Sequence, residues 1–234
     1  MTSLNPSRVM IGVPTAEFAR QAIFYDHFNA MDKPEGTVIV FAHGQSPARN
    51  RNLIIEGAIE HNCTHLLFID DDCLVPKDML TRLMKHEVPA VMGLYLKRSF
   101  PHEPIIFDYA DERGYCHHYF PKEGENGLLP IVGGGLGCCL LDVNIFKLME
   151  RPWIRLGELE KDHWSDDTGF FKRLREHDIK VYCDLDTRVG HLASVTIWPS
   201  IRDGKWCTTY DTSGTASVTI PAQVPVGELQ DVSR

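Results

Sequence analysis

Short apolar runs alternate with segments of helical periodicity through the first half of the chain. Four β-rich runs are expected to form strands: residues 8–14, 37–42, 65–69 and 89–96. The run 65–69 is continuously apolar, which is typical of a strand buried on both faces of a parallel sheet. Helices are expected after Thr15 and, from apolar residues at i, i+3 and i+4 spacing, over 46–62 and 77–87. This alternation predicts an α/β fold with a doubly wound, mostly parallel sheet.

Two expected helices carry recognisable start signals. Ser46 stands directly before a proline, which is the order preferred at an N-cap and the first helical position. A second helix is expected to begin near Ser165, with Phe170, Phe171 and Leu174 turned inward. Both starts matter because charged residues follow each of them.

The strand–helix rhythm breaks after Arg98. Residues 99–136 are rich in Pro, Gly, His and Tyr, and we expect loops and short antiparallel strands there. Strands over 136–142 and 179–184 complete an expected domain of residues 1–195. Residues 196–234, a C-terminal extension rich in Thr, Ser, Gly and Pro, are expected to be an extended or partly ordered tail.

Composition narrows the function classes. The 234 residues are 43% hydrophobic and 24% charged, which is typical of a globular protein with a substantial core. The formal net charge of -8 argues against nucleic-acid binding, which needs clustered Lys and Arg. No apolar run approaches the roughly 20 residues of a membrane span, and no signal peptide is expected. Seven cysteines without a CxxC pair indicate reduced thiols in a cytoplasmic protein.

Three consecutive aspartates, Asp70, Asp71 and Asp72, follow the apolar run of residues 65–69. One interpretation is a solvated acidic turn before the next helix. The other is a metal site, because in extended backbone Asp70 and Asp72 point to one side and suit Mg²⁺ or Mn²⁺. Ligands of doubly wound sheets bind beyond the carboxyl ends of the strands, where the triplet lies, and this favours the metal site.

Arg49 and Arg51 occupy the first turn of the helix that starts after Ser46, where the helix dipole disfavours cations. They can strengthen an anion site at the helix N-terminus. Equally, they can point into solvent or pair with acids of the chain.

Other candidate groups signal little by themselves. Asp166 and Asp167 stand at a helix start, where carboxylates are common caps. His191 follows a strand-like segment, and a single histidine is more often structural than a ligand. The segment 116–120, CHHYF, offers metal ligands but fits an edge strand or loop better.

From Val9 to about Leu192, the order and spacing of these motifs resemble the nucleotide-sugar glycosyltransferases of the GT-A fold, particularly family 2 and related bacterial and bacteriophage enzymes. The resemblance rests on IGVPT as the first strand, ARNRN as the helix before the acidic strand, FIDDDCLVP as the DxD motif, GGGLGCCLLDVNIF as the glycine-led acceptor-half strand, SDDTGFFKRLREHDIKVYCD as the acidic helix and strand, and VGHL as the closing histidine.

The resemblance implies roles on the donor side. The residues expected to bind the nucleotide-sugar are Pro14, Thr15, Arg49, Asp70, Asp71 and Asp72. A divalent cation, Mn²⁺ or Mg²⁺, would bridge the diphosphate and be held by Asp72 and His191, with Asp70 in support.

On the acceptor side, the resemblance implies that Asp167 is the general base for the acceptor hydroxyl. Asp166 stands where family members often carry Glu, and Gly135 and Trp164 are expected to border the acceptor. Helix-start N–H groups are expected to keep the pKa of Asp167 low, so that it is ionised at neutral pH.

The implied activity is a metal-dependent, hexosyltransferase-type transfer of a sugar from a nucleoside-diphosphate sugar to an acceptor hydroxyl, with inversion. In the resembling enzymes an acidic turn after the second strand commonly helps to hold the nucleobase of the donor. This chain has AHGQ at 42–45 instead, so the resemblance does not identify the nucleotide. A nucleotidyltransferase of related fold and a non-catalytic carbohydrate-binding module are the alternatives. The first usually carries a glycine-rich basic loop after the first strand, and this chain has none there. A non-catalytic module is disfavoured because the chain keeps all four expected site residues: Asp70, Asp72, Asp167 and His191.

The expected partners are the nucleotide-sugar donor and an acceptor that is a glycan, a protein or a small molecule. A homo-oligomer is compatible with the sequence, whereas nucleic acid and a membrane span are not expected. The expected location is the cytoplasm of a bacterial or phage-infected host cell.

Overall fold

The computed structural model describes residues 7–15, 22–99, 101–110, 116–155, 165–203, 205–212 and 216–221. The chain divides into two compact units. The first comprises Met1–Leu96 and Glu103–His191, and the second comprises Lys97–His102 and Leu192–Arg234.

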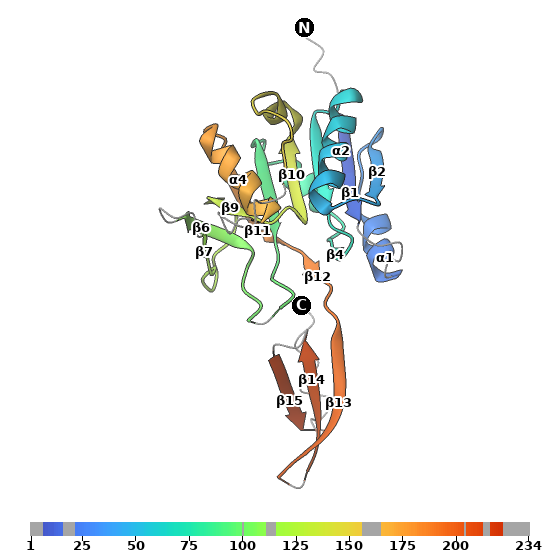
Figure 1. Cartoon of the computed structure of the whole chain (residues 1–234), viewed down its shortest axis with the longest axis vertical. Coiled ribbons are helices and arrows are strands. Elements are labelled where there is room, and N and C mark those ends of the chain that lie inside the picture. The colour runs from blue at the N-terminus through green and yellow to red at the C-terminus, as the bar shows by residue number, and fades with distance from the viewer. Residues whose placement is uncertain are drawn as a thin grey trace. The chain divides into compact units, whose positions relative to one another are not determined.

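A seven-stranded sheet forms the centre of the first unit (Figure 1). Its strands, in spatial order, are β2 (Val38–His43), β1 (Val9–Thr15), β3 (His65–Ile69), β10 (Cys138–Asp142), β5 (Ala90–Leu94), β11 (Val181–Arg188) and β8 (Leu128–Ile131). β10 and β8 run antiparallel to their neighbours, and the other five strands share one direction. The expected mixed α/β fold with a large, mostly parallel sheet is therefore confirmed.

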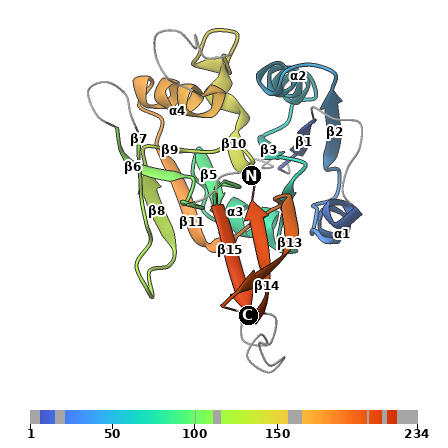
Figure 2. The same ribbon diagram turned by 60° about the horizontal axis from the view of Figure 1, so that its bottom comes forward.

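Helices cover both faces of this sheet. α2 (Pro47–Glu60) and α4 (Asp166–Glu176) lie on one side, and α3 (Met79–Met84) lies on the other (Figure 2). α1 (Ala22–Ala30) packs beside β2, where the rings of Phe28 and Phe41 are 5.6 Å apart. Among the residues with assigned structure, no helix is both long and apolar enough to cross a membrane.

The expected helix starts at Ser46 and Ser165 are confirmed. The Ser46 side chain accepts the N–H of Arg49 and caps α2, and Pro47 is the first helical residue. The Ser165 side chain accepts the N–H of Thr168 and caps α4. Phe170, Phe171 and Leu174 of α4 are buried, as its periodicity predicts.

Short strands fill the segment between β5 and β10. β6 (Ile106–Ala110) pairs antiparallel with β7 (Cys116–His118) and β9 (Gly133–Gly134). The expectation of short antiparallel strands in this segment is confirmed. A further two-residue pair joins β4 (Cys73–Leu74) to β12 (Gly190–His191), and neither strand is foreseeable from an apolar pattern of that length.

The second unit is a three-stranded antiparallel sheet of β13 (Val195–Arg202), β14 (Lys205–Thr212) and β15 (Ala216–Pro221), with β14 in the middle. This is more regular than the extended or partly ordered tail that the composition suggests. The threonines, valines and isoleucines of these segments favour pleated backbone, and their strand preference prevails over the glycines and prolines nearby.

Candidate functional site

The residues expected to carry chemistry gather at one edge of the seven-stranded sheet, where its parallel strands end. β1 ends at Thr15, and Asp70 directly follows β3. Asn50 of α2 donates its side-chain N–H to the carbonyl of Thr15 at 3.0 Å, which holds the helix start against this edge. The start of α4 is fixed by Asp167, which accepts the N–H of Leu136 at 3.1 Å.

Arg51 lies at the centre of an ion cluster of four residues, the Arg51 cluster: Arg51, Asp70, Asp166 and Asp167. Its Nη2 donates to both oxygens of Asp70 at 2.8 and 3.0 Å. Its Nη1 reaches Asp166 Oδ2 at 3.2 Å and Asp167 Oδ1 at 3.1 Å. Only 5% of the Arg51 side chain is exposed. Of the interpretations open for this arginine, the structure shows pairing with acids of the chain.

Arg49 lies outside this cluster. Two residues along an α-helix are separated by about 200° of rotation, so Arg49 and Arg51 face opposite ways. Arg49 is exposed, whereas Asn50 and Arg51 are buried. Contact of Arg49 with a donor nucleotide stays a prediction.

The acidic triplet forms a turn rather than a strand end. β3 stops at Ile69, and the N–H of Cys73 bonds to the carbonyl of Asp70 at 2.9 Å, which closes a tight turn. The expectation that Asp70 and Asp72 point to one side is therefore wrong, because it requires extended backbone. Asp70 reaches Arg51, while Asp72 reaches His191.

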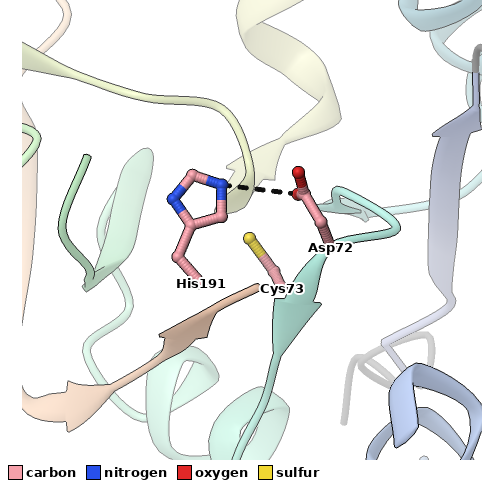
Figure 3. A group of neighbouring side chains, drawn as sticks. All are labelled: Asp72, Cys73 and His191. Atoms are coloured by element: carbon pink, nitrogen blue, oxygen red, sulfur yellow. Dashed lines mark ion pairs between the residues drawn. The ribbon is translucent and has the colours of Figure 1, made fainter. Parts of the chain in front are cut away.

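Asp72, Cys73 and His191 form a second cluster, the Asp72–Cys73–His191 group. The β4–β12 pairing places His191 opposite Cys73. Asp72 Oδ1 lies 3.5 Å from His191 Nε2 (Figure 3). The three potential ligand atoms all lie within 4.8 Å of one another. These residues come from segments more than a hundred residues apart, and only the fold brings them together.

The orientation of His191 suits a metal ligand. Its Nδ1 lies 2.7 Å from the carbonyl oxygen of Leu96, which can only accept, so Nδ1 carries the proton. Nε2 then directs a lone pair toward the Asp72 carboxylate. Two acceptors at this distance call for a shared cation, either a second proton on the ring or a metal ion. A backbone carbonyl on the remote ring nitrogen is the usual support of a ligating histidine.

Asp167 has a pKa raised to about 6. Burial is the largest cause, and the neighbouring charges of Asp166 and Asp70 raise the pKa further. Arg51 and the N–H of Leu136 oppose this shift. The expectation of a low pKa is wrong, because desolvation and two neighbouring carboxylates outweigh Arg51 and the N–H of Leu136.

Gly135 packs against Tyr95. A Cβ at this position would lie 2.0 Å from the Tyr95 hydroxyl oxygen, so no side chain fits. The same hydroxyl accepts the N–H of Gly137 at 3.0 Å, and the Tyr95 ring meets His191 edge-on. Close packing thus accounts for the glycine, and a place beside the acceptor stays a prediction.

The remaining predicted residues differ in how far the structure describes them. Pro14 and Thr15 are buried at the end of β1. Asp71 lies in the turn and is partly exposed. Trp164 lies outside the described residues.

Three residues of this edge carry no clear signal in the sequence: Asn50, Cys73 and Tyr95. Asn50 is fully buried and ties α2 to β1. Cys73 directly follows the acidic triplet, which is the one local sign that it lies at this edge of the sheet. Tyr95 follows an ordinary strand, and nothing near it in the chain marks its contacts.

The fold defines a class, that of mixed α/β proteins with a large, mostly parallel central sheet. No family model matches the sequence, and no curated protein matches it significantly. Among solved structures, the chain is similar to A197 from STIV, with a TM-score of 0.54 and 13% identity over 93% of this chain and 96% of that one. It is more weakly similar to 4-diphosphocytidyl-2C-methyl-D-erythritolsynthase from Anaerococcus prevotii DSM 20548, with a TM-score of 0.44 and 9% identity over 76% and 86%. The first likeness supports the fold, and the second carries no argument.

Proposed function

We propose that the protein is a metal-dependent glycosyltransferase that moves a sugar from a nucleoside-diphosphate sugar to an acceptor hydroxyl. The proposal is supported by one observation above all. A carboxylate suited to act as a base, Asp167, and a pair suited to hold a cation, Asp72 and His191, flank the same turn after β3. The sequence resemblance to GT-A glycosyltransferases assigns the same residues to these two tasks.

On the donor side, Asp72 and His191 would hold Mn²⁺ or Mg²⁺, with Asp70 in support. When bound, the cation would supply charge stabilisation for the departing diphosphate, typically worth several kcal/mol. Asp70 also accepts both bonds from Arg51 Nη2, which fixes its carboxylate at the carboxyl edge of the sheet. Pro14, Thr15, Arg49 and Asp71 would bind the nucleotide, as the resemblance implies.

On the acceptor side, Asp167 would take the proton of the hydroxyl. One of its oxygens is held by Arg51 and the other by the N–H of Leu136, so the carboxylate is oriented before any acceptor binds. A pKa of about 6 leaves it mostly ionised at neutral pH and more basic than an ordinary aspartate. Direct displacement by the activated hydroxyl inverts the anomeric centre.

Metal-dependent nucleotide binding tests the donor half of this proposal. Nucleoside diphosphates are titrated into the protein with and without Mn²⁺, and binding is measured by calorimetry and by the rise of the melting temperature. We expect Asp72→Asn to abolish the Mn²⁺-dependent part and to leave the melting temperature of the free protein nearly unchanged.

Asp178→Asn is the matched control. Asp178 is exposed and has φ 56°, a conformation that asparagine adopts readily, so this variant should bind as the wild type does. Unchanged Mn²⁺-dependent affinity in Asp72→Asn would overturn the proposed donor site.

A further inference from the structure

The Asp72–Cys73–His191 group contains a buried thiol beside its carboxylate and imidazole. Cys73 is 1% exposed. Its sulfur, an Asp72 oxygen and a His191 ring nitrogen lie within 4.8 Å of one another, and Figure 3 shows the sulfur directed at the space between the other two side chains. Apolar packing of the thiol does not explain why a carboxylate and an imidazole both lie beside its sulfur.

We infer that Cys73 is a third protein ligand of the cation and that its sulfur makes the site prefer Zn²⁺ and Co²⁺ to Mn²⁺, and Mn²⁺ to Mg²⁺. A metal–sulfur bond forms as the thiol proton leaves to solvent. The inference rests on the proposed function only in taking Asp72 and His191 as metal ligands. It assigns the cation class, which the resemblance leaves as Mn²⁺ or Mg²⁺.

The turn after β3 explains why sulfur rather than a second carboxylate completes the group. Asp70 is drawn toward Arg51, which engages both of its oxygens. The same turn brings the side chains of the adjacent residues Asp72 and Cys73 to His191, although neighbours in a regular strand would point to opposite faces. The ligand set is therefore one oxygen, one nitrogen and one sulfur.

This ligand set has a definite chemical preference. Mg²⁺ demands oxygen ligands in near-octahedral geometry, and the group offers a single carboxylate. Thiolate and imidazole favour Zn²⁺, and Co²⁺ occupies similar sites, whereas Mn²⁺ stands low in the order of affinities. Three protein ligands leave at least one open position, as in catalytic zinc sites, where an oxygen of a bound diphosphate could coordinate.

Co²⁺ reports the sulfur directly, because a thiolate bonded to Co²⁺ gives an intense near-ultraviolet charge-transfer absorption. The full-length chain is freed of metal with a chelator and titrated with Co²⁺ alone. We expect this absorption to saturate at one equivalent, to be lost in Cys73→Ser and to be lost or greatly weakened in His191→Ala.

Cys63→Ser is the matched control, because Cys63 is also a buried free thiol but lies before β3, at the opposite edge of the sheet. It should keep the full absorption. Zn²⁺ should displace Co²⁺ at stoichiometric amounts, whereas Mg²⁺ in large excess should not. Removal of the sulfur should lower Zn²⁺ affinity at least ~10-fold, and Mn²⁺ affinity by less. Mutation of residues that only hydrogen-bond to metal ligands already lowers metal affinity roughly 10–100-fold.

A measurement on the wild-type chain keeps the inference testable if Cys73→Ser fails to fold. X-ray absorption of the Zn²⁺-loaded protein should show one sulfur neighbour at about 2.3 Å. Co²⁺ or Zn²⁺ bound through Asp72 and His191 without a sulfur signal would overturn the role of Cys73 and leave the proposed function standing. Absence of any metal binding would overturn both.

Discussion

The Arg51 cluster and the Asp72–Cys73–His191 group meet at the turn after β3, where Asp70 and Asp72 are two residues apart, yet the two groups differ in how their charges are balanced. The Arg51 cluster carries its own cation, a guanidinium with 5% of its side chain exposed, bonded to acids from the end of β3 and from α4. The other group brings together a carboxylate, a thiol and an imidazole, with no Lys or Arg among its members.

The difference separates a cluster whose ion pairs form on folding from a group that we propose binds a cation. Arg51 joins α2, β3 and α4, so its ion pairs form whenever these elements pack. The Asp72–Cys73–His191 group offers three potential ligand atoms within 4.8 Å of one another, and we propose that a cation binds there. Mutations and pH titrations test this contrast, and the mutation with the greatest expected effect comes first.

Removal of the Arg51 charge should have the largest effect. Arg51→Met keeps an unbranched side chain but leaves three carboxylates without their shared cation. Loss of one partner of a buried ion pair typically costs about 3–5 kcal/mol of unfolding free energy. Urea unfolding monitored by circular dichroism measures this cost.

Arg49→Met is the matched control, because Arg49 is the same residue type two positions away on the exposed side of α2. Its free energy of unfolding should stay within about 0.5 kcal/mol of the wild type. Equal stability of the two variants would show that the Arg51 cluster does not support the fold.

The next effect falls on turnover. Asp167→Asn is nearly isosteric and keeps one acceptor oxygen for either Arg51 or the N–H of Leu136, so it should fold and still bind Mn²⁺ with nucleotide. Hydrolysis or transfer of a nucleotide-sugar should fall at least ~10²-fold, as expected for loss of a general base. Asp166→Asn should lower turnover by a smaller factor. Asp166 bonds to Arg51, whereas Asp167 is oriented by both Arg51 and the N–H of Leu136.

If Asp167→Asn retained near-normal turnover, the base would lie elsewhere or the enzyme would be retaining. The anomer of the released sugar, followed by NMR, distinguishes these two cases. A loss of Mn²⁺-dependent binding in the same variant would instead show that the Arg51 cluster and the metal group are not separable.

The smallest effect is a displacement of the pH profile. Because the pKa of Asp167 is about 6, its base form is lost as pH falls through this value, and kcat/KM for donor hydrolysis should fall with a midpoint near pH 6. Asp166→Asn removes a like charge that raises this pKa, so the midpoint should move to lower pH. A midpoint near pH 4 would contradict a raised pKa of Asp167.

The same shift has a consequence for stability, with a definite sign. A carboxyl whose pKa rises from 3.8, the ordinary value of an aspartate, to about 6 on folding binds its proton more tightly in the folded state. Its contribution to the free energy of unfolding is therefore present below about pH 4 and is lost as pH rises through 6. In Asp167→Asn, the free energy of unfolding should no longer fall for this reason as pH rises through 6. Urea unfolding at several pH values measures this.

Local sequence patterns were sufficient to predict four strands of the central sheet and the starts of two helices. The apolar runs predict β1, β2, β3 and β5, and Ser46 and Ser165 mark the starts of α2 and α4, because strand burial and helix capping depend on residues close in the chain. The direction of β10 and the two-residue pairing of β4 with β12 were not predictable in this way, since they are set by distant partners.

The amino-acid sequence is enough to identify the chemical groups at the carboxyl edge: aspartates after β3 and at the start of α4, arginines at the start of α2, and a histidine near the end of the domain. Which of these side chains pair with one another follows from the folded chain alone. The turn after β3 sends Asp70 to Arg51 and Asp72 to His191, and burial beside like charges raises the pKa of Asp167. The physical reason is that backbone preferences act over a few residues, whereas desolvation and ion pairing depend on which side chains a hundred residues apart are brought into contact.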